Sequence, residues 1–256
     1  TSIASNKTEN ILISFFGRMN YTYKDKYLAT FTLRRDGSSR FGANQRWGTF
    51  PSGSLAWRAS EEEFIKNLNI FSSLKVRAGF GVTGNERIGD YASYANMANT
   101  RYTFDGSGNT AGVHMSQSSP ANPALKWEST AQYNIGMDMG FFNNRLMVTV
   151  DAYTKKTKDL LMNVALPYYT GFTSGQSNIG SIRNEGLELD VTSHNLTGSF
   201  VWDTKLNVAY NRNKVLDLGT NGDIYLTSSK PYGSVSEEAF AIIRQGEPLG
   251  SLFGYK

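Results

Sequence analysis

The chain has 256 residues, a formal net charge of +4 and no cysteine. The lack of thiols excludes a disulfide scaffold, a thiolate metal site and a cysteine nucleophile. Lys and Arg are spread along the chain without a basic run, so no nucleic-acid partner is expected. No stretch of about 18 apolar residues is present, which excludes a transmembrane helix, and no signal-peptide pattern is found.

In the first half of the chain, apolar and polar side chains alternate with a period of two, which is typical of strands with two different faces. The clearest example places Leu74, Val76 and Ala78 on one face and Lys75 and Arg77 on the other. The pattern predicts strands over residues 11–23, 27–34, 54–59 and 74–83. A short capped helix is predicted over 60–68, with Glu61, Glu62 and Glu63 complementing its dipole.

The second half of the chain repeats the alternation. Residues 133–141 and 146–153 form a predicted hairpin around a tight turn at Asn143 and Asn144. Two further strands are predicted over 187–192 and 200–211. The sequence therefore predicts an all-β, antiparallel fold of about eight strands, longer than the roughly five to six residues usual in globular proteins.

The predicted connections alternate in length along the chain. Short connections fall at 24–26, 60–72, 142–144 and 194–198, and long ones at 36–48, 84–124, 159–180 and from 212 onward. Up-and-down barrels of outer membranes have this arrangement, with tight periplasmic turns and extended extracellular loops.

The two faces of the predicted strands differ in charge. Lys, Arg, Asp and Asn recur on the polar face, whereas the apolar face of the strands at 74–83, 133–153 and 200–211 has almost none. A charge facing lipid at mid-bilayer costs roughly 2–4 kcal/mol in such barrels. The segregation favours a lipid-facing apolar face and a wet, polar lumen over the core of a soluble β-sandwich.

Sequence motifs give no support for catalysis. Residues 79–84 match a dinucleotide-binding fingerprint by letter, but no helix is expected after them. The two histidines, His114 and His194, are predicted at opposite ends of the strands, which disfavours a shared metal site or a histidine-based triad. We therefore expect no enzyme activity, no catalytic residues, no cofactor and no metal.

Aromatic side chains in the longest predicted loop are candidates for ligand or partner contact. An aromatic ring there can stack on a sugar or meet a second protein, or it can pack within the loop. The candidates are Tyr91, Tyr94, Tyr102 and Phe104, together with Trp127 near the end of the same connection.

Several ordered stretches resemble one family, the SusC/RagA-type TonB-dependent outer-membrane transporters. The resemblance runs over most of residues 34–255 and rests on residues 35–42, 46–52, 74–85, 88–91, 122–130, 151–161, 184–189 and 246–255. Examples are Arg-Asp-Gly-Ser-Ser-Arg-Phe-Gly at 35–42 and Asn-Pro-Ala-Leu-Lys-Trp-Glu-Ser-Thr at 122–130.

The resemblance implies that residues 1–256 are a transmembrane segment of a plugged barrel of about 22 strands in the bacterial outer membrane, with no plug domain and no TonB box in this chain. It implies import of an oligosaccharide or peptide with a SusD-like surface lipoprotein, driven by TonB–ExbB–ExbD. The alternatives are another outer-membrane barrel, such as a siderophore receptor, and a soluble β-rich glycan-binding or adhesin module.

Overall fold

The structure of the chain is a computed structural model that describes residues 7–103, 111–219, 222–227 and 239–254. For residues 98–103, 111–116, 165 and 227 it describes the backbone only. No helix among the described residues is long and apolar enough to cross a membrane.

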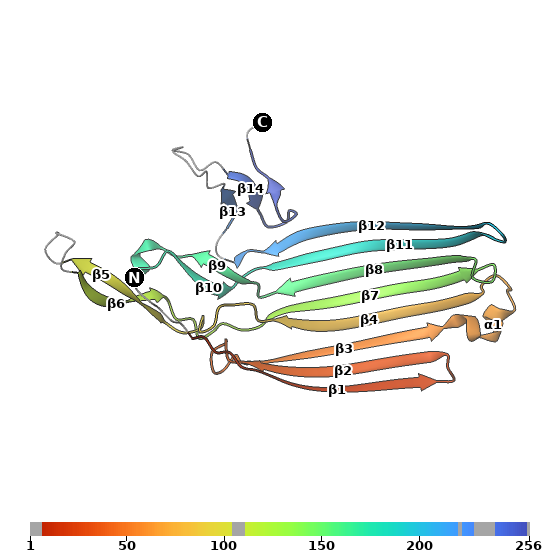
Figure 1. The fold of residues 1–256 in the computed structure, drawn as a ribbon, viewed down its shortest axis with the longest axis horizontal. Helices are drawn as coiled ribbons and strands as arrows, with labels where there is room; N and C mark the ends of the chain where they lie inside the picture. Colours follow the sequence, from red (N-terminus) through yellow and green to blue (C-terminus); the bar gives the residue numbers. More distant parts are fainter. Residues whose placement is uncertain (1–6, 104–110, 220–221, 228–238, 255–256) are drawn as a thin grey trace.

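Eight long strands form one antiparallel sheet in which each strand pairs with its neighbours in order of appearance (Figure 1). This confirms the predicted number of strands and their all-β arrangement. The strands are β1 (Leu12–Tyr23), β2 (Tyr27–Ser38), β3 (Trp47–Arg58), β4 (Ser73–Asn85), β7 (Glu128–Phe141), β8 (Leu146–Lys158), β11 (Ser181–Thr197) and β12 (Val201–Asp217).

Most connections at one end of the sheet are short, and the exception, residues 59–72, contains the helix described below. In the β1–β2 turn, Lys24 and Asp25 have positive φ angles, and in the β7–β8 turn Asn143 and Asn144 do. These connections cover only residues 24–26 and 142–145, and backbone in the left-handed region lets the chain reverse within such short segments. Consecutive strands can therefore reverse within a few residues, and we call this end of the sheet the short-turn end.

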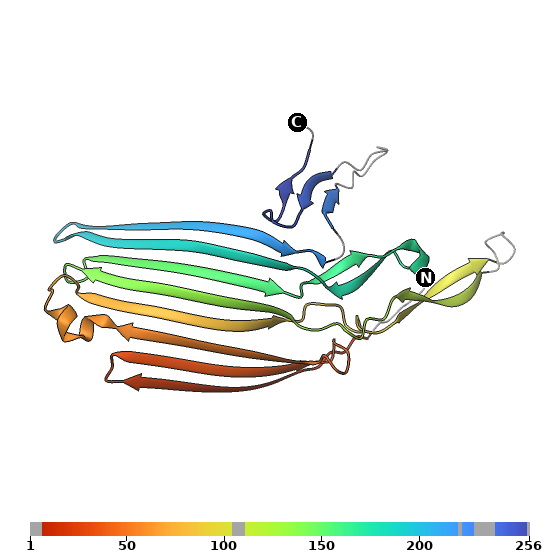
Figure 2. The same cartoon turned by 180° about the vertical axis from the view of Figure 1, so that it is seen from behind.

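Apart from residues 39–46, the connections at the opposite end, the long-loop end, contain secondary structure of their own (Figures 1 and 2). One hairpin pairs β5 (Asn96–Thr103) with β6 (Ala111–Ser119), and another pairs β9 (Leu161–Ala165) with β10 (Ser174–Asn178) around the 3₁₀ turn η2 (Tyr168–Thr170). A small sheet of β13 (Ile224–Thr227), β14 (Ala239–Ile243) and β15 (Ser251–Leu252) follows β12. These elements were not predicted, because they lie within segments that the sequence assigns to loops.

The predicted helix after β3 is shorter than expected and is capped differently. It consists of a 3₁₀ turn, η1 (Ala59–Glu61), and one α-helical turn, α1 (Glu63–Lys66), whose N-cap Glu62 makes no side-chain capping bond. The Glu62 carboxylate instead accepts hydrogen bonds from Lys26 Nζ at 2.9 Å and Tyr27 Oη at 2.8 Å. The prediction that the glutamates simply complement the helix dipole was therefore wrong for Glu62, which fastens the helix to the β1–β2 turn.

This ion pair shifts the titration of both partners. The hydrogen bond from Lys26, followed by that from Tyr27, holds the pKa of the Glu62 carboxyl below its usual range. Glu62 in turn raises the pKa of the Lys26 ammonium. The charged form of each group is favoured by its partner.

The main buried cluster lies at the long-loop end of the sheet. It contains Phe41, Phe50, Ile88, Leu125 and Trp127. Elsewhere many large apolar side chains are exposed, including Phe16 at 76% and Tyr210 at 66%. Isolated soluble domains rarely expose apolar surface on this scale. Part of the sheet surface is therefore expected to contact lipid or another protein surface.

Candidate functional site

The strand register arranges side chains in rows that cross the whole sheet. One apolar row crosses all eight strands and consists of Tyr21, Ala29, Leu55, Ala78, Ile135, Ala152, Leu187 and Tyr210. Successive side chains of a strand point to opposite faces, so the rows two residues away lie on the same face. On β4 this face runs from Leu74 to Val82, about 26 Å at roughly 3.3 Å per residue, comparable with the apolar band of about 25 Å in outer-membrane barrels.

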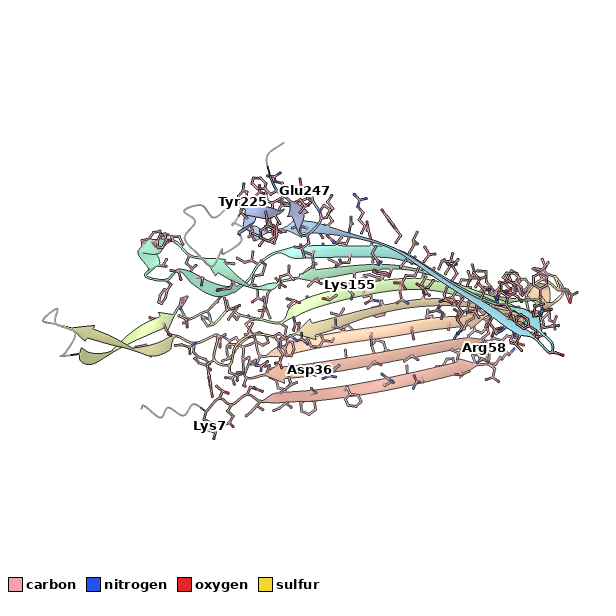
Figure 3. The ribbon with its side chains drawn as sticks, turned by 45° about the horizontal axis from the view of Figure 1, so that its top comes forward. Lys7, Asp36, Arg58, Lys155, Tyr225 and Glu247 are labelled. Carbon is pink, nitrogen blue, oxygen red and sulfur yellow. The ribbon has the colours of Figure 1, made fainter. Side chains whose placement is uncertain are left out.

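The opposite face is polar over the same span. A representative row consists of Arg18, Thr32, Ser52, Gly81, Gln132, Lys155, Asn184 and Asn213. Figure 3 shows side chains leaving both faces of the sheet, with Asp36 towards the long-loop end and Arg58 at the short-turn end. At these two rows, polar and apolar side chains are segregated in each of the eight strands, as predicted for the strands at 74–83, 133–153 and 200–211.

Glycines make room for the polar side chains on this face. A Cβ added at Gly79 would lie 2.6 Å from Asn134 Oδ1, and one at Gly186 would lie 2.5 Å from Asn211 Oδ1. A Cβ at Gly136 would collide with the Asp151 carboxylate and would lie 2.9 Å from Arg77 NH2. The match by letter to a dinucleotide fingerprint at residues 79–84 therefore falls within strand β4, where Gly79 leaves room for Asn134 and Gly84 leaves room for the Phe50 and Trp127 rings.

An ion-pair network occupies the middle of the polar face. Arg77 on β4 donates two hydrogen bonds to Asp138 on β7, at 2.8 and 2.9 Å, and one to Asp151 on β8 at 3.1 Å. Thr149 donates a further bond to Asp138 at 3.2 Å. The fork of the guanidinium suits such two-point binding of a carboxylate. The network joins three neighbouring strands and leaves its charges on the polar side.

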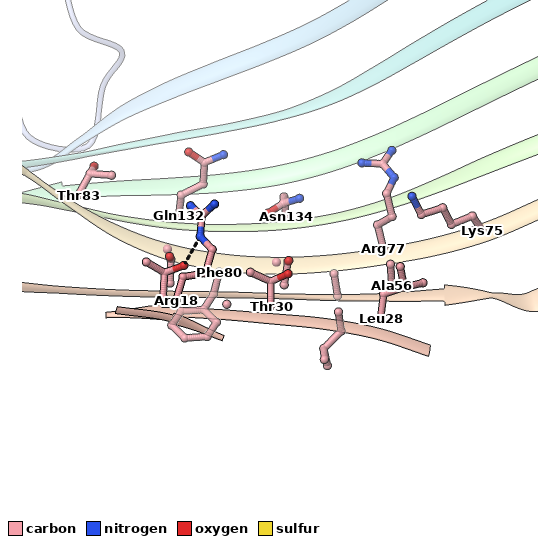
Figure 4. Close-up of a pocket in the computed structure, with 18 residues that line it drawn as sticks. Arg18, Leu28, Thr30, Ala56, Lys75, Arg77, Phe80, Thr83, Gln132 and Asn134 are labelled. Carbon is pink, nitrogen blue, oxygen red and sulfur yellow. Dashed lines mark hydrogen bonds between the residues drawn. The ribbon is translucent and has the colours of Figure 1, made fainter. Parts of the chain in front are cut away.

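The polar face is hollowed beside this network. The hollow holds about 600 Å³, and its polar lining includes Arg18, Lys75, Arg77, Gln132 and Asn134. Figure 4 shows Lys75 and Arg77 extending to the same side as Gln132 and Asn134, while the Phe80 ring turns the other way. Such a surface offers both donors and acceptors to a hydrated molecule.

Tyr91 and Tyr94, predicted as contact residues, lie in the connection between β4 and β5 and are 44% and 48% exposed. They line a hollow of about 320 Å³ together with Ser39, Arg40 and Asp90. Arg40 Nε donates to Asp90 Oδ1 at 2.9 Å, so two residues of the lining are joined to each other. Both tyrosine rings are therefore accessible at the long-loop end.

Trp127 lies in the buried cluster rather than on the surface. It is 9% exposed, its ring packs against Phe41 and Phe50 with centroids 5.3 Å away, and its Nε1 donates to the Arg46 carbonyl at 2.9 Å. A Cβ at Gly84 would meet both Trp127, at 2.8 Å, and Phe50. In this structure the ring is committed to packing.

The other two predicted contact residues are less fully described. Tyr102 belongs to β5, where its backbone pairs with Gly112, and its side chain is not described. Phe104 lies outside the described residues. Sequence reasoning also passed over Tyr168 and Tyr169, which are 89% and 90% exposed in the β9–β10 hairpin. Their signal is the turn Pro-Tyr-Tyr-Thr-Gly, which ends at Gly171 with a φ of +79°.

The described residues hold no group of three or more His, Cys, Asp or Glu side chains that could bind a metal ion. His114 lies on β6 in a long-loop hairpin, whereas His194 lies near the short-turn end of β11, where its Nδ1 is 2.7 Å from Asp203 Oδ1. The histidines thus belong to opposite ends of the strands.

A sheet of long strands with one apolar face, one polar face and short turns alternating with long loops defines the wall of a membrane β-barrel. The family model described as "TonB dependent receptor-like, beta-barrel" matches residues 2–243. The chain belongs to this family, and it is therefore part of an outer-membrane barrel.

Individual relatives agree with this assignment. The chain is 42% identical to TonB-dependent receptor P39 of Formosa agariphila, over 97% of this chain and 22% of that protein. It is also 42% identical to TonB-dependent receptor SusC of Bacteroides thetaiotaomicron, over 97% of this chain and 25% of that protein. The chain thus spans about a quarter of the length of these curated relatives.

A solved structure has the same fold. The RagAB peptide importer in its closed-closed state superposes with a TM-score of 0.81 and 32% identity, covering 94% of this chain and 25% of that chain. Family membership excludes the alternative of a soluble adhesin module.

Proposed function

We propose that the complete protein is a non-enzymatic importer that moves glycans or peptides across the outer membrane. In this proposal the chain supplies eight adjacent strands of the barrel wall. The observation that carries it is the two-faced sheet, whose apolar rows suit lipid and whose polar rows suit a water-filled lumen.

The polar face supports a hydrated cargo. Its amides, hydroxyls and guanidinium groups can donate to and accept from sugar hydroxyls or peptide groups. Tyr91 and Tyr94 would meet cargo at the long-loop end, because their rings are exposed beside a hollow. Tyr102 and Phe104 are further candidates for this role, whereas the Trp127 ring is buried in the cluster with Phe41 and Phe50.

The long-loop end is the proposed docking side for a SusD-like lipoprotein. Support comes from the relatives named SusC and RagAB and from the exposed tyrosines Tyr168 and Tyr169. Energy would come from TonB–ExbB–ExbD acting through other parts of the complete protein. The long loops would then face outward and the short turns the periplasm.

Growth of a deletion strain tests the proposed cargo. Cells that lack the gene are supplied with oligosaccharides or peptides as sole carbon source, and separately with iron-limited medium. Loss of growth on a glycan or peptide, restored by the intact gene, supports the proposal. A defect confined to iron-limited medium contradicts it and favours the siderophore-receptor alternative.

Cysteine labelling tests the proposed orientation, because this chain has no cysteine of its own. Tyr169→Cys and Asn143→Cys are placed separately in a full-length protein free of other thiols. An impermeant maleimide should label the first in intact cells and the second only after the outer membrane is opened. Labelling of Asn143→Cys alone in intact cells would invert the orientation.

A further inference from the structure

The lipid-facing face of the sheet carries a basic row at its long-loop end. Lys156 on β8 is opposite Arg183 on β11, which is opposite Lys214 on β12. These residues share the face of Ala152, Leu187 and Tyr210, since they lie four residues along the same strands. Lys158 and Arg212 belong to the adjoining rows of this face.

The basic row is unfavourable by itself. Neighbouring strands lie about 4.8 Å apart, and like charges directly opposite each other destabilise a sheet. Of the nearby carboxylates, Glu185 lies 3.3 Å from Arg183, and Asp217 is opposite Ser181 and accepts a bond from its own loop. Within the described part of the chain, neither Lys156 nor Lys214 has an ion-pair partner. An anion from outside the chain would therefore reduce the repulsion between these three cations.

An apolar groove adjoins the basic row on the side of the membrane centre. It holds about 690 Å³ between the Tyr133 and Tyr210 rings. Its floor is low because Ala78 and Ala152 alternate with Ile135 and Leu187 in the same row. Glu185 and Arg212 line its end nearest the basic row. The distance from Ala152 to Lys156 along β8 is about 13 Å, within reach of one acyl chain and its head group.

We propose that this surface is a binding site for a phosphate-bearing lipid of the membrane leaflet at the long-loop end. The phosphate would lie on Lys156, Arg183 and Lys214, and an acyl chain would lie in the groove. Charge complementarity and the adjoining apolar groove together specify a lipid rather than a free anion. The inference depends on the lipid-facing assignment and not on the proposed cargo, so the growth experiment and the experiment below fail independently.

Native mass spectrometry of the full-length protein in neutral detergent tests the proposal. The probes are phosphatidic acid and the diacylglycerol with the same chains. The intact protein should retain phosphatidic acid in preference to diacylglycerol. Because a cation near an anionic lipid surface contributes about 1 kcal/mol, or roughly fivefold, the combined change Lys156→Gln, Arg183→Gln and Lys214→Gln should weaken retention by more than about tenfold.

Two further variants make the result specific. A matched control, Lys75→Gln with Lys155→Gln and Lys205→Gln, removes the same charge from the polar face and should retain the lipid. Ala152→Phe fills the groove without changing charge, is tolerated on a lipid-facing surface, and should weaken retention several-fold. Equal loss in the polar-face control, or no preference for phosphatidic acid, would overturn the proposal. So would displacement by millimolar inorganic phosphate with no effect of Ala152→Phe, which would indicate a site for free anions.

Discussion

The two faces of the eight-stranded sheet are built from the same strands but are constrained in different ways. On the apolar face, side chains of varied size share rows: Ala78 lies opposite Ile135, and these two side chains have no polar group with which to bond. On the polar face, side chains lie over glycines and bond to named partners, as Arg77 does with Asp138 across Gly136. Lipid adapts to the shape of a surface but does not tolerate charge. A network of hydrogen-bonded side chains, in contrast, requires that the residues beneath it keep their size. The apolar face should therefore be sensitive to charge and the polar face to size.

The largest expected effect concerns the main buried cluster at the long-loop end, which is packed like a soluble core. Trp127→Ala should lower the free energy of unfolding of the full-length protein by about 3–5 kcal/mol, because it opens a cavity in the cluster with Phe41 and Phe50. Denaturant unfolding in detergent measures this. Trp127→Phe keeps an aromatic ring and should cost less. Unchanged stability with lost cargo binding would instead assign Trp127 to ligand contact.

The next effect tests the charge sensitivity of the apolar face. Val150→Arg should destabilise the barrel by about 2–4 kcal/mol, because it buries a charge in lipid. Its neighbour on the other face, Asp151→Asn, should change stability by less than about 1 kcal/mol, since the amide oxygen still accepts the bond from Arg77. Assembly into the outer membrane and unfolding in detergent both measure the difference. Equal damage from the two changes would mean that the faces are misassigned.

A smaller effect tests the size sensitivity of the polar face. Gly136→Ala should cost about 1–3 kcal/mol, because the new methyl group displaces Asp151 and Arg77. Gly17→Ala is the matched change on the apolar face of β1, where a Cβ meets nothing within 4 Å. It should be neutral or slightly stabilising. An equal loss of stability from Gly136→Ala and Gly17→Ala would contradict the proposed difference between the two faces.

The smallest effect lies outside both faces, at the short-turn end. Because the folded-state pKa of Glu62 is lowered, the stability contributed by its bond to Lys26 is present above the unfolded pKa near 4.5 and is lost as pH falls through the folded value. The protection factors of the amides of residues 63–66, which correct for the intrinsic pH dependence of exchange, should fall over that window. Glu62→Gln should remove the pH dependence, and persistence of the dependence in this variant would assign it to another group.

The strand pattern could be predicted because the membrane imposes a strict alternation, but the strand ends could not. The strand predicted over 187–192 extends over Ser181–Thr197. The prediction was too short because Arg183 and Glu185, on the apolar face of this strand, interrupt the alternation of apolar and polar residues. β3 begins at Trp47 rather than Ser54, because Gly48, Pro51 and Gly53 read as a loop. Pro51 is tolerated because β3 pairs with β4 only from Ser52 onward.

The candidate contact residues were harder to predict than the strands. The sequence does not show whether an aromatic residue in a long connection is buried or exposed. Only the tertiary structure distinguishes buried Trp127 from exposed Tyr91. The long-loop hairpins were missed because β9 and β10 are short and no bilayer enforces a two-faced pattern on them. The pairing of Glu62 with Lys26 joins residues 36 apart in sequence, which no local pattern reveals.

The central claim, that one face of the sheet meets lipid and the other meets water, can be measured directly on β8. Single cysteines at positions 148 to 153 of the full-length protein, freed of other thiols and reconstituted in bilayers, are each spin-labelled. Collision rates with oxygen, which concentrates in lipid, should peak at Val148, Val150 and Ala152. Collision rates with a water-soluble nickel chelate should peak at Thr149, Asp151 and Tyr153, out of phase with oxygen. Rates that vary in phase, or without a period of two, would contradict the account.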